Sequence, residues 1–198
     1  MKIIRADEQT TTPWKNGGGS TTEIAAEPAG ASLDTFHWRI SMAQVASDGP
    51  FSEFPGIDRT LSVVKGTGLS LTIGDNAPVM LDRGSPAISF AGDIATSARL
   101  GAGEITDLNV MTWRLRFSHR LRRIREAESC DFDGADIAVV LSLNGHTALT
   151  SKRDATTLDH GDAAVLAEAD DACFQVAPNA ACDCYLVLLY RCVSPSIG

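Results

Sequence analysis

The chain has 198 residues, and its 25 Asp and Glu outnumber its 17 Lys and Arg to give a net charge of −8. This balance argues against nucleic-acid binding, which depends on a basic field across the domain. The longest apolar run, residues 185–190, is shorter than the ~18 residues of a membrane-spanning helix, and the amino terminus lacks the apolar stretch of a secretory signal. We therefore expect a cytoplasmic protein that binds neither nucleic acid nor membrane.

The first distinctive segment is Pro13–Gly19, with the sequence Pro-Trp-Lys-Asn-Gly-Gly-Gly. Consecutive glycines let a backbone pass close to another surface or to a ligand. Trp14, Lys15 and Asn16 offer an aromatic face, a cation and an amide. The residues by themselves fit either a ligand-contacting loop or an ordinary flexible loop.

A predicted strand follows at residues 38–42, where Trp38 and Ile40 alternate with Arg39 and Ser41. Because side chains alternate between the two faces of a strand, Arg39 and Ser41 share one face. A turn-rich segment, Gly49–Arg59, comes next.

Short β-branched segments recur along the rest of the chain, at residues 61–65, 69–73, 137–143 and 185–190. Seventeen glycines and eight prolines lie mostly at the ends of such segments. Residues 121–128 are too few and too rich in arginine for a core helix. This pattern predicts an all-β sandwich or barrel.

A self-comparison divides the chain into two halves. Sliding the sequence by 77 residues lays residues 61–90 on residues 138–167, with six identical pairs among the 30. Two of these pairs are glycines, Gly68 on Gly145 and Gly84 on Gly161, at positions where a tight turn selects glycine. We predict a duplicated fold with an amino-terminal half at residues 1–113, a connector at 114–134 and a carboxy-terminal half at 135–198.

The predicted connector holds most of the local positive charge, since residues 114–125 contain six of the 13 arginines. Aromatic residues that could stack on bases do not interleave with the arginines after Phe117. A solvated connector or a surface for an acidic partner fits this pattern better than a nucleic-acid patch. A protein-interaction module, with a homodimer formed along exposed strand edges, is one alternative function.

Cysteine and histidine are used sparingly. The five cysteines are an odd number, which fits a reducing compartment better than a disulfide framework. Cys182 and Cys184 share one face of a predicted strand, and without a second ligand pair we interpret them as buried small side chains. The four histidines are scattered and do not indicate a His-rich metal site.

Several motifs together resemble the HutD/Ves family, bicupins associated in many bacteria with histidine-utilisation operons. They are Pro13–Gly19, Trp38–Ser41, Gly49–Arg59, Phe90–Asp93 and Asp107–Met111. The resemblance covers mainly the first 111 residues, and Trp113-Arg114 departs from the paired arginines of relatives. It implies an all-β, RmlC-like bicupin, with two cupin-like β-barrel or sandwich halves in one chain, the first carrying a ligand pocket and the second mainly structural.

The cupin resemblance permits a test for metal ligands. Metal-binding cupins carry an H-x-H pair followed by a glutamate at fixed spacing from a glycine. When that glycine is laid on Gly66, Arg59 occupies the glutamate position, and Ser52 and Phe54 occupy the two histidine positions. Zinc and transition metals need about three or four convergent ligands, so we predict no metal and no cofactor.

An arginine in place of the metal-binding glutamate changes the preferred ligand, because a guanidinium pairs with carboxylates through two parallel hydrogen bonds. We expect a pocket in which Arg59 and Arg39 clamp a small carboxylate and Lys15 adds charge. Amide and hydroxyl groups then orient the rest of the ligand, and Trp14 supplies an apolar wall. The predicted ligand-binding residues are Trp14, Lys15, Asn16, Arg39, Ser41, Arg59 and Asn109.

The family resemblance implies an accessory or regulatory, non-catalytic role in histidine utilisation, with urocanate or formylglutamate as candidate ligands. The alternative is a metal-independent isomerase or hydrolase acting on the same acids. In that hypothesis Glu23 or Asp58 is the general base, and Lys15 or an arginine stabilises an oxyanion.

Overall fold

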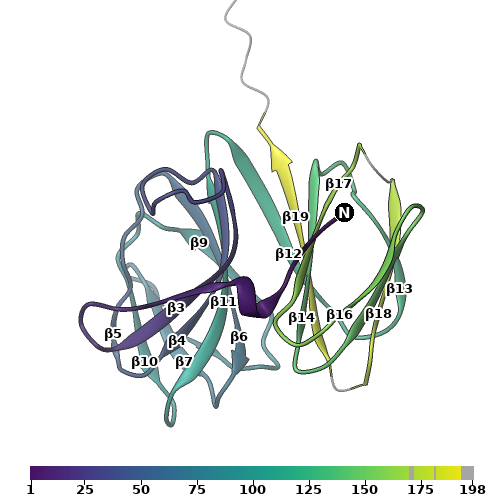
Figure 1. Cartoon of the computed structure of the whole chain (residues 1–198). Helices are drawn as coiled ribbons and strands as arrows, with labels where there is room; N and C mark the ends of the chain where they lie inside the picture. The colour runs from purple at the N-terminus through teal and green to yellow at the C-terminus, as the bar shows by residue number, and fades with distance from the viewer. Residues whose placement is uncertain (170–171, 181, 193–198) are drawn as a thin grey trace, which may run out of the picture. The chain divides into compact units, whose positions relative to one another are not determined.

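The computed structural model describes residues 1–169, 172–180 and 182–192, and it confirms the predicted all-β fold. The chain forms two compact units. We call Thr10–Arg116 the central unit, and Met1–Gln9 together with Phe117–Gly198 the terminal unit. Each unit is built from antiparallel sheets (Figure 1), and among the described residues the one helical element is the 3-10 turn η1 (Ala6–Glu8).

The central unit consists of two sheets. Its strands are β2 (Thr10–Pro13), β3 (Gly19–Glu27), β4 (Trp38–Val45), β5 (Gly49–Pro50), β6 (Ile57–Lys65), β7 (Leu69–Ile73), β8 (Val79–Leu81), β9 (Ile88–Ala91), β10 (Thr96–Leu100) and β11 (Ile105–Trp113). Six form a sheet in the order β2-β3-β4-β11-β6-β9, and four form a sheet in the order β5-β10-β7-β8. Leu61, Val63, Leu69 and Leu71 form one apolar cluster from β6 and β7.

The terminal unit also consists of two sheets. Its strands are β1 (Lys2–Ile4), β12 (Phe117–Ile124), β13 (Glu128–Asp131), β14 (Ile137–Leu143), β15 (Thr147–Ser151), β16 (Ala155–Leu158), β17 (Ala163–Ala167), β18 (Cys173–Pro178) and β19 (Asp183–Arg191). The sheet orders are β1-β17-β14-β19-β12 and β13-β18-β15-β16. Phe132 and Phe174 meet edge to face in the core, with ring centroids 5.6 Å apart.

The two units repeat one arrangement, in agreement with the predicted duplication. The order β4-β11-β6-β9 in the central unit recurs as β12-β19-β14-β17 in the terminal unit, and β5-β10-β7-β8 recurs as β13-β18-β15-β16. A shift of 77 residues brings β6, β7 and β8 onto β14, β15 and β16. The central unit adds β2 and β3 beyond β4, whereas the sheet of the terminal unit ends at β12.

The boundaries of the units differ from those predicted. Residues 1–9 belong to the terminal unit, where β1 pairs with β17 and Lys2 lies opposite Val165 (Figure 1). Arg5 donates through Nη1 to the Asp162 carboxylate at 2.6 Å, and the backbone N–H of Ala6 donates to the same carboxylate at 2.9 Å. These long-range contacts fix the amino-terminal segment to a partner far along the chain.

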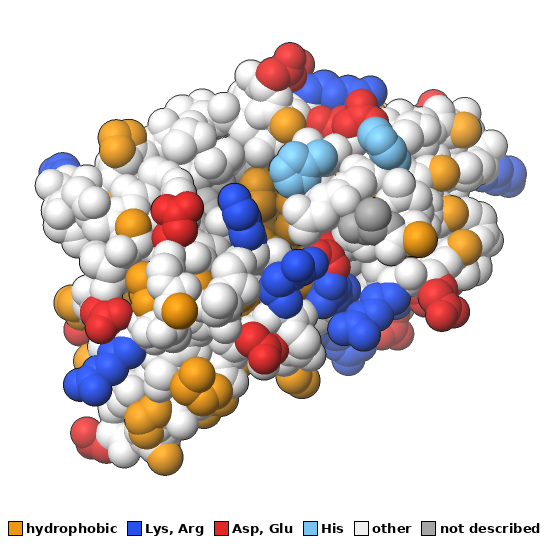
Figure 2. Space-filling view, turned by 90° about the horizontal axis from the view of Figure 1, so that it is seen from below, with side chains coloured by type: hydrophobic (Ala, Val, Ile, Leu, Met, Phe, Trp, Pro, Cys, Tyr) orange, Lys and Arg blue, Asp and Glu red, His pale blue; other side chains and the backbone are white. Residues whose placement is uncertain are grey.

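The predicted connector at 114–134 forms the strands β12 and β13. Side chains along β12 alternate, so Arg120 and Arg122 project from the sheet and form ion pairs with Asp133 and Glu128. Figure 2 shows Lys and Arg side chains beside Asp and Glu side chains on one face of the molecule. These arginines therefore belong to a strand surface on which the charges of both signs are mixed.

Two further expectations concern the cysteines and the membrane. Cys182 and Cys184 are buried and belong to the apolar cluster of the terminal unit, as interpreted from their spacing. Burial raises the pKa of the Cys184 thiol to about 12. Over the described ranges, the structure contains no helix long and apolar enough to span a bilayer.

Candidate functional site

The central unit contains a cavity of about 710 Å³ over the inner face of its six-stranded sheet. This volume lies within the ~300–1,000 Å³ range of small-molecule sites. The structure brings all seven predicted residues to its wall, and they are Trp14, Lys15, Asn16, Arg39, Ser41, Arg59 and Asn109. The expected grouping therefore forms within one unit.

The pairing of neighbouring strands places the polar side chains of the cavity floor in rows across the sheet. Met111 on β11 lies opposite Arg39 on β4 and opposite Arg59 on β6, so two guanidinium-bearing residues flank one methionine. Two residues back along β11, Asn109 lies opposite Ser41, and two residues further back is Asp107. Because alternate residues of a strand share a face, all three β11 side chains face the same way.

Arg59 is the most deeply buried cation of the site, with 7% of its surface exposed. Its Cζ lies 5.2 Å from the ring centroids of Phe51 and Phe90 and 5.5 Å from that of Phe54. Cation–π attraction to three rings stabilises the guanidinium where water is largely excluded. Burial lowers the pKa of Arg59 to about 10, which leaves it charged at neutral pH.

The donors of Arg59 are only partly used. Nη2 donates to Asn109 Oδ1 at 2.9 Å, and Nη1 donates to the Ser52 carbonyl oxygen at 3.3 Å. Nε is buried and has no hydrogen-bond partner among the residues that the structure describes. An unsatisfied buried donor on a charged group is uncommon in native structures.

Asn109 connects Arg59 to a buried carboxylate. Its Nδ2 donates to Asp107 Oδ1 at 2.5 Å, while its Oδ1 accepts from Arg59. Asp107 is 1% exposed, and burial raises its pKa to about 7 against the opposing effects of Arg59, Asn109 and the Ala43 backbone. The cavity floor therefore carries a carboxyl group that changes charge near neutral pH.

Arg39 has a partner within the site. Its Nε donates to Glu23 Oε2 at 2.7 Å and its Nη1 donates to Ser41 Oγ at 3.2 Å. Glu23 lies opposite Ser41 in the strand register, which brings the acid beside the arginine. The two arginines of the expected clamp therefore differ. Glu23 balances the charge of Arg39, whereas Nε of Arg59 has no hydrogen-bond partner within the described part of the chain.

The loop between β2 and β3 forms one side of the cavity. Trp14 donates through Nε1 to Thr21 Oγ1 at 2.8 Å, and a Cβ at Gly19 would lie 2.1 Å from the Gln44 carbonyl oxygen and 3.1 Å from the Trp14 ring. Glycine at position 19 thus lets the tryptophan lie against the strand. Asn16 Oδ1 accepts from the Gly18 backbone at 3.0 Å, so this amide helps to hold the loop.

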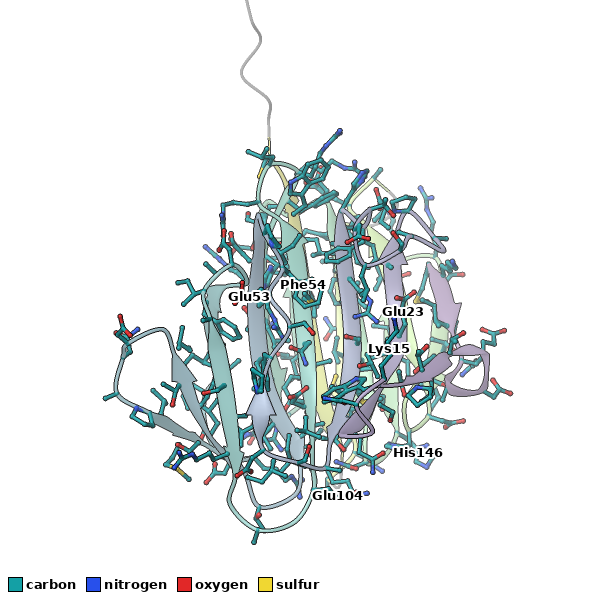
Figure 3. All side chains as sticks on the ribbon, turned by 90° about the vertical axis from the view of Figure 1, so that its left-hand side faces the viewer. Lys15, Glu23, Glu53, Phe54, Glu104 and His146 are labelled. Atoms are coloured by element: carbon teal, nitrogen blue, oxygen red, sulfur yellow. The ribbon has the colours of Figure 1, made fainter. Side chains whose placement is uncertain are left out.

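Lys15 adds a cation at the edge of the cavity. It is exposed, lines the cavity and forms no ion pair with any residue that the structure describes. Figure 3 shows Lys15 and Glu23 close together, with Phe54 on the segment across from them. The ammonium group is therefore available to a ligand that enters between the two segments.

Asp58, one of the two expected general bases, lies away from the cavity. Successive residues of β6 point to opposite faces, so the side chains of Asp58 and Arg59 lie on opposite sides of the sheet. Asp58 instead pairs with Arg114 at 2.8 Å, and the same guanidinium pairs with Asp93 at 3.2 Å. Asp58 therefore does not line this cavity, whereas Glu23 does.

The predicted residue set lacks the groups that determine the environment of Arg59. Asp107 could have been found from its position two residues before Asn109, because the strand places both on one face. The aromatic rings of Phe51 and Phe54 fall in the Gly49–Arg59 motif, but nothing in their spacing shows that they surround an arginine. Across the described part of the chain, no cluster of three or more His, Cys, Asp or Glu could hold a metal ion.

Comparison with known proteins shows which proteins this chain is similar to. An uncharacterized 21.2 kDa protein from the hutC 3' region of Pseudomonas putida is 31% identical over 150 residues, 76% of this chain and 77% of that protein. Protein Ves of Citrobacter koseri is 40% identical over 110 residues, 55% of this chain and 56% of that protein.

Solved structures are similar to this chain as well. HutD from Pseudomonas fluorescens SBW25, in a formate condition, superposes with a TM-score of 0.78 at 28% identity, over 97% of this chain and 99% of that chain. A cupin 2 conserved barrel domain protein from Leptotrichia buccalis gives a TM-score of 0.56 at 12% identity, over 92% of this chain and 96% of that chain, a likeness of fold alone. The sequence profile of HutD matches residues 6–184. The chain, a bicupin in fold, belongs to the HutD family.

Proposed function

We propose that the central unit binds a small carboxylate through Arg59. The observation that carries the proposal is Arg59, a buried cation that lines the cavity and forms no ion pair with a carboxylate of the described residues. Leaving a buried donor unsatisfied costs about 1–3 kcal/mol, and more for a charged group. A carboxylate bound beside the guanidinium pairs with its charge and forms charge-assisted hydrogen bonds.

The charges around the cavity support an anionic ligand. Glu23 balances Arg39, and Asp107 is only partly ionised near neutral pH, while Arg59 and Lys15 remain positive. The excess positive charge favours a small organic acid. Trp14 and Met111 supply apolar surface for the carbon atoms of such a ligand.

The family supports a role in the degradation of histidine. The relative from Pseudomonas putida is encoded in a hutC region, and the chain belongs to the HutD family. The proposed ligands are urocanate and formylglutamate, both small carboxylates with a polar group at the other end. We place the protein in the cytoplasm in an accessory or regulatory role that requires binding and no turnover.

Calorimetric titration of the purified protein with urocanate and with formylglutamate tests this function. Truncating one partner of a buried charge pair costs about 2–5 kcal/mol, so Arg59→Ala is expected to weaken binding by at least about 30-fold. Arg99→Ala, which removes an exposed arginine on β10, is the matched control and should bind as the wild type does.

Since Arg59→Ala leaves Asp107 without its cation, a melting curve must show that the variant is folded. Arg59→Lys keeps the charge but loses the planar donor group, and it is expected to bind with intermediate affinity. Absence of detectable heat for both acids with the wild-type protein would contradict the proposal.

Asp107 supports a second candidate function, a metal-independent isomerase or hydrolase acting on the same acids. A carboxyl group with a pKa of about 7 in a cavity can give or take a proton at neutral pH. Incubating each acid with the protein and following it by ultraviolet absorbance or NMR separates this candidate from simple binding. Turnover that is lost in Asp107→Asn would establish catalysis, and unchanged acids would exclude it for these substrates.

A further inference from the structure

The carboxylate of Asp107 depends on Arg59 for its charge. It lies 1% exposed on β11 and accepts hydrogen bonds from the Asn109 amide and the Ala43 backbone. Within the described residues, no Lys, Arg or His forms an ion pair with it. The positive charge that stabilises the ionised carboxylate is therefore that of Arg59. The side-chain amide of Asn109 is hydrogen-bonded to both groups.

The other charged groups around Asp107 are already balanced or distant. Arg39 on β4 is engaged by Glu23 on β3, and Lys15 lies in the exposed loop between β2 and β3. Arg59 on β6 is thus the cation whose charge most strongly favours the ionised form of Asp107. A ligand that neutralises Arg59 removes the one charge that favours the ionised form of this acid.

An incoming carboxylate has this effect on Arg59. Its negative charge pairs with the guanidinium and repels the ionised Asp107 across a cavity of low polarity. The repulsion is relieved when Asp107 takes a proton from solvent onto a carboxylate oxygen, forming an O–H bond. The cavity then gains an anion and a proton together, and its net charge does not change.

We propose that ligand binding and protonation of Asp107 are coupled, so that the site takes up a carboxylate anion together with one proton. This inference rests on the proposed function, because it assigns the regulation of the same site. It makes the affinity for an organic acid dependent on pH even when the ligand itself does not titrate.

The direction of the pH dependence follows from the state of the free protein. Above the free-state pKa of about 7, Asp107 is ionised before binding and must gain a proton, so binding weakens as pH rises. The dissociation constant is expected to increase about tenfold per pH unit until the pKa of the bound state is passed. Below about pH 6 the acid already holds its proton, and the affinity is expected to become independent of pH.

Calorimetry in two buffers of different ionisation enthalpy measures the coupled proton directly. Formylglutamate and formate are suitable probes because their carboxyl groups stay ionised from about pH 6 to 9. In phosphate and Tris at about pH 8, the difference in heat should correspond to nearly one proton for the wild type and nearly none for Asp107→Asn. Asp75→Asn, which changes an exposed acid in the turn between β7 and β8, should match the wild type.

A second readout keeps the test valid if Asp107→Asn does not fold. In the wild-type protein, ligand addition should produce the infrared band of a protonated carboxyl group. Binding with no buffer dependence and no new band would overturn the coupling while leaving carboxylate binding intact. If neither acid binds the wild-type protein, both the coupling and the proposed function fail.

Discussion

The sheets of the two units have the same strand order, but the side chains that lie between the sheets differ. On the strands β6 and β11 of the central unit, Arg59, Asn109 and Asp107 form a polar chain beside a cavity. The corresponding strands β14 and β19 contribute Ala138, Val140, Leu186 and Leu188 to an apolar cluster. The backbone arrangement is thus compatible with either a polar cavity floor or an apolar core.

The difference also involves the strands that have no counterpart. β2 and β3 extend the sheet of the central unit, and they carry Glu23, Thr21 and the loop with Trp14 and Lys15 to the cavity. Among the described residues, the terminal sheet ends at β12 on the corresponding edge and has no equivalent wall. In this chain, the cavity of the central unit is therefore formed by polar inward positions together with the additional pair of strands.

The largest effect is expected from a cavity made in the apolar cluster of the terminal unit. Phe174 is 2% exposed and packs edge to face on Phe132, so Phe174→Ala should lower the free energy of unfolding by about 3–5 kcal/mol. Urea denaturation measures the loss. Calorimetry on the folded fraction should show unchanged ligand affinity, and a large loss of affinity would contradict the division of roles between the units.

A second comparison concerns two buried aspartates with opposite pH effects. Folded Asp107 keeps its proton up to a pKa of about 7, whereas in the unfolded chain it ionises near 3.8. The unfolded state therefore binds fewer protons between these values, and stability falls as pH rises through this range. The wild type should lose roughly 4 kcal/mol relative to Asp107→Asn between about pH 4 and 7, measured by urea denaturation.

Asp162 in the terminal unit provides the contrast. Burial opposes its ionisation, but hydrogen bonds from Arg5, Ala6 and Asp159 hold its pKa below the ordinary value. The folded state therefore releases this proton more readily, and the stabilisation is present above the unfolded pKa and lost as pH falls. Asp162→Asn should consequently lose stability most at neutral pH, and equal pH profiles for the two variants would contradict the assigned environments.

The aromatic rings around Arg59 should matter more for binding than for folding. Phe90 is only half-buried, and its ring lies 5.2 Å from Arg59 Cζ. Phe90→Ala removes one cation–π contact of about 1 kcal/mol and should weaken carboxylate binding roughly fivefold by calorimetry. Phe90→Tyr preserves the ring and serves as the control, and equal affinities for the Ala and Tyr variants would assign the ring to packing alone.

The smallest effect is expected at the arginines of β12. Arg120 and Asp133 form an ion pair with side chains that are 69% and 60% exposed. Because solvent screens such pairs, Arg120→Gln should change the free energy of unfolding by less than about 1 kcal/mol and leave ligand binding unaltered. A change in molecular mass in solution on this substitution would instead favour the interaction surface considered from the sequence.

The residues that sequence alone could place are those governed by local periodicity. Alternation identified the strand with Arg39 and Ser41, and the spacing of glycines such as Gly68 and Gly145 revealed the duplication. The family motifs then indicated Arg59 and Asn109. These features depend on neighbouring residues or on repeated spacing, both of which are visible along the chain.

The features that were missed depend on partners distant in sequence. Six arginines concentrated in one segment concealed the strand β12, whose pairing with β19 joins Phe117 to Arg191. The pairing of Glu23 with Arg39 and the burial of Asp107 likewise arise only when strands from different parts of the chain align. Patterns in neighbouring residues cannot predict which polar groups are brought together by strands that are distant in sequence.

The placement of residues 1–9 in the terminal unit has a consequence for synthesis of the chain. β1 is synthesised before its partner β17, which is completed about 160 residues later, a delay of roughly 8–30 s at bacterial or slower rates. The central unit, contiguous from Thr10 to Arg116, has all its strands available well before then. The central unit is therefore expected to fold first, and β1 is expected to pair only when the rest of the terminal unit has been synthesised.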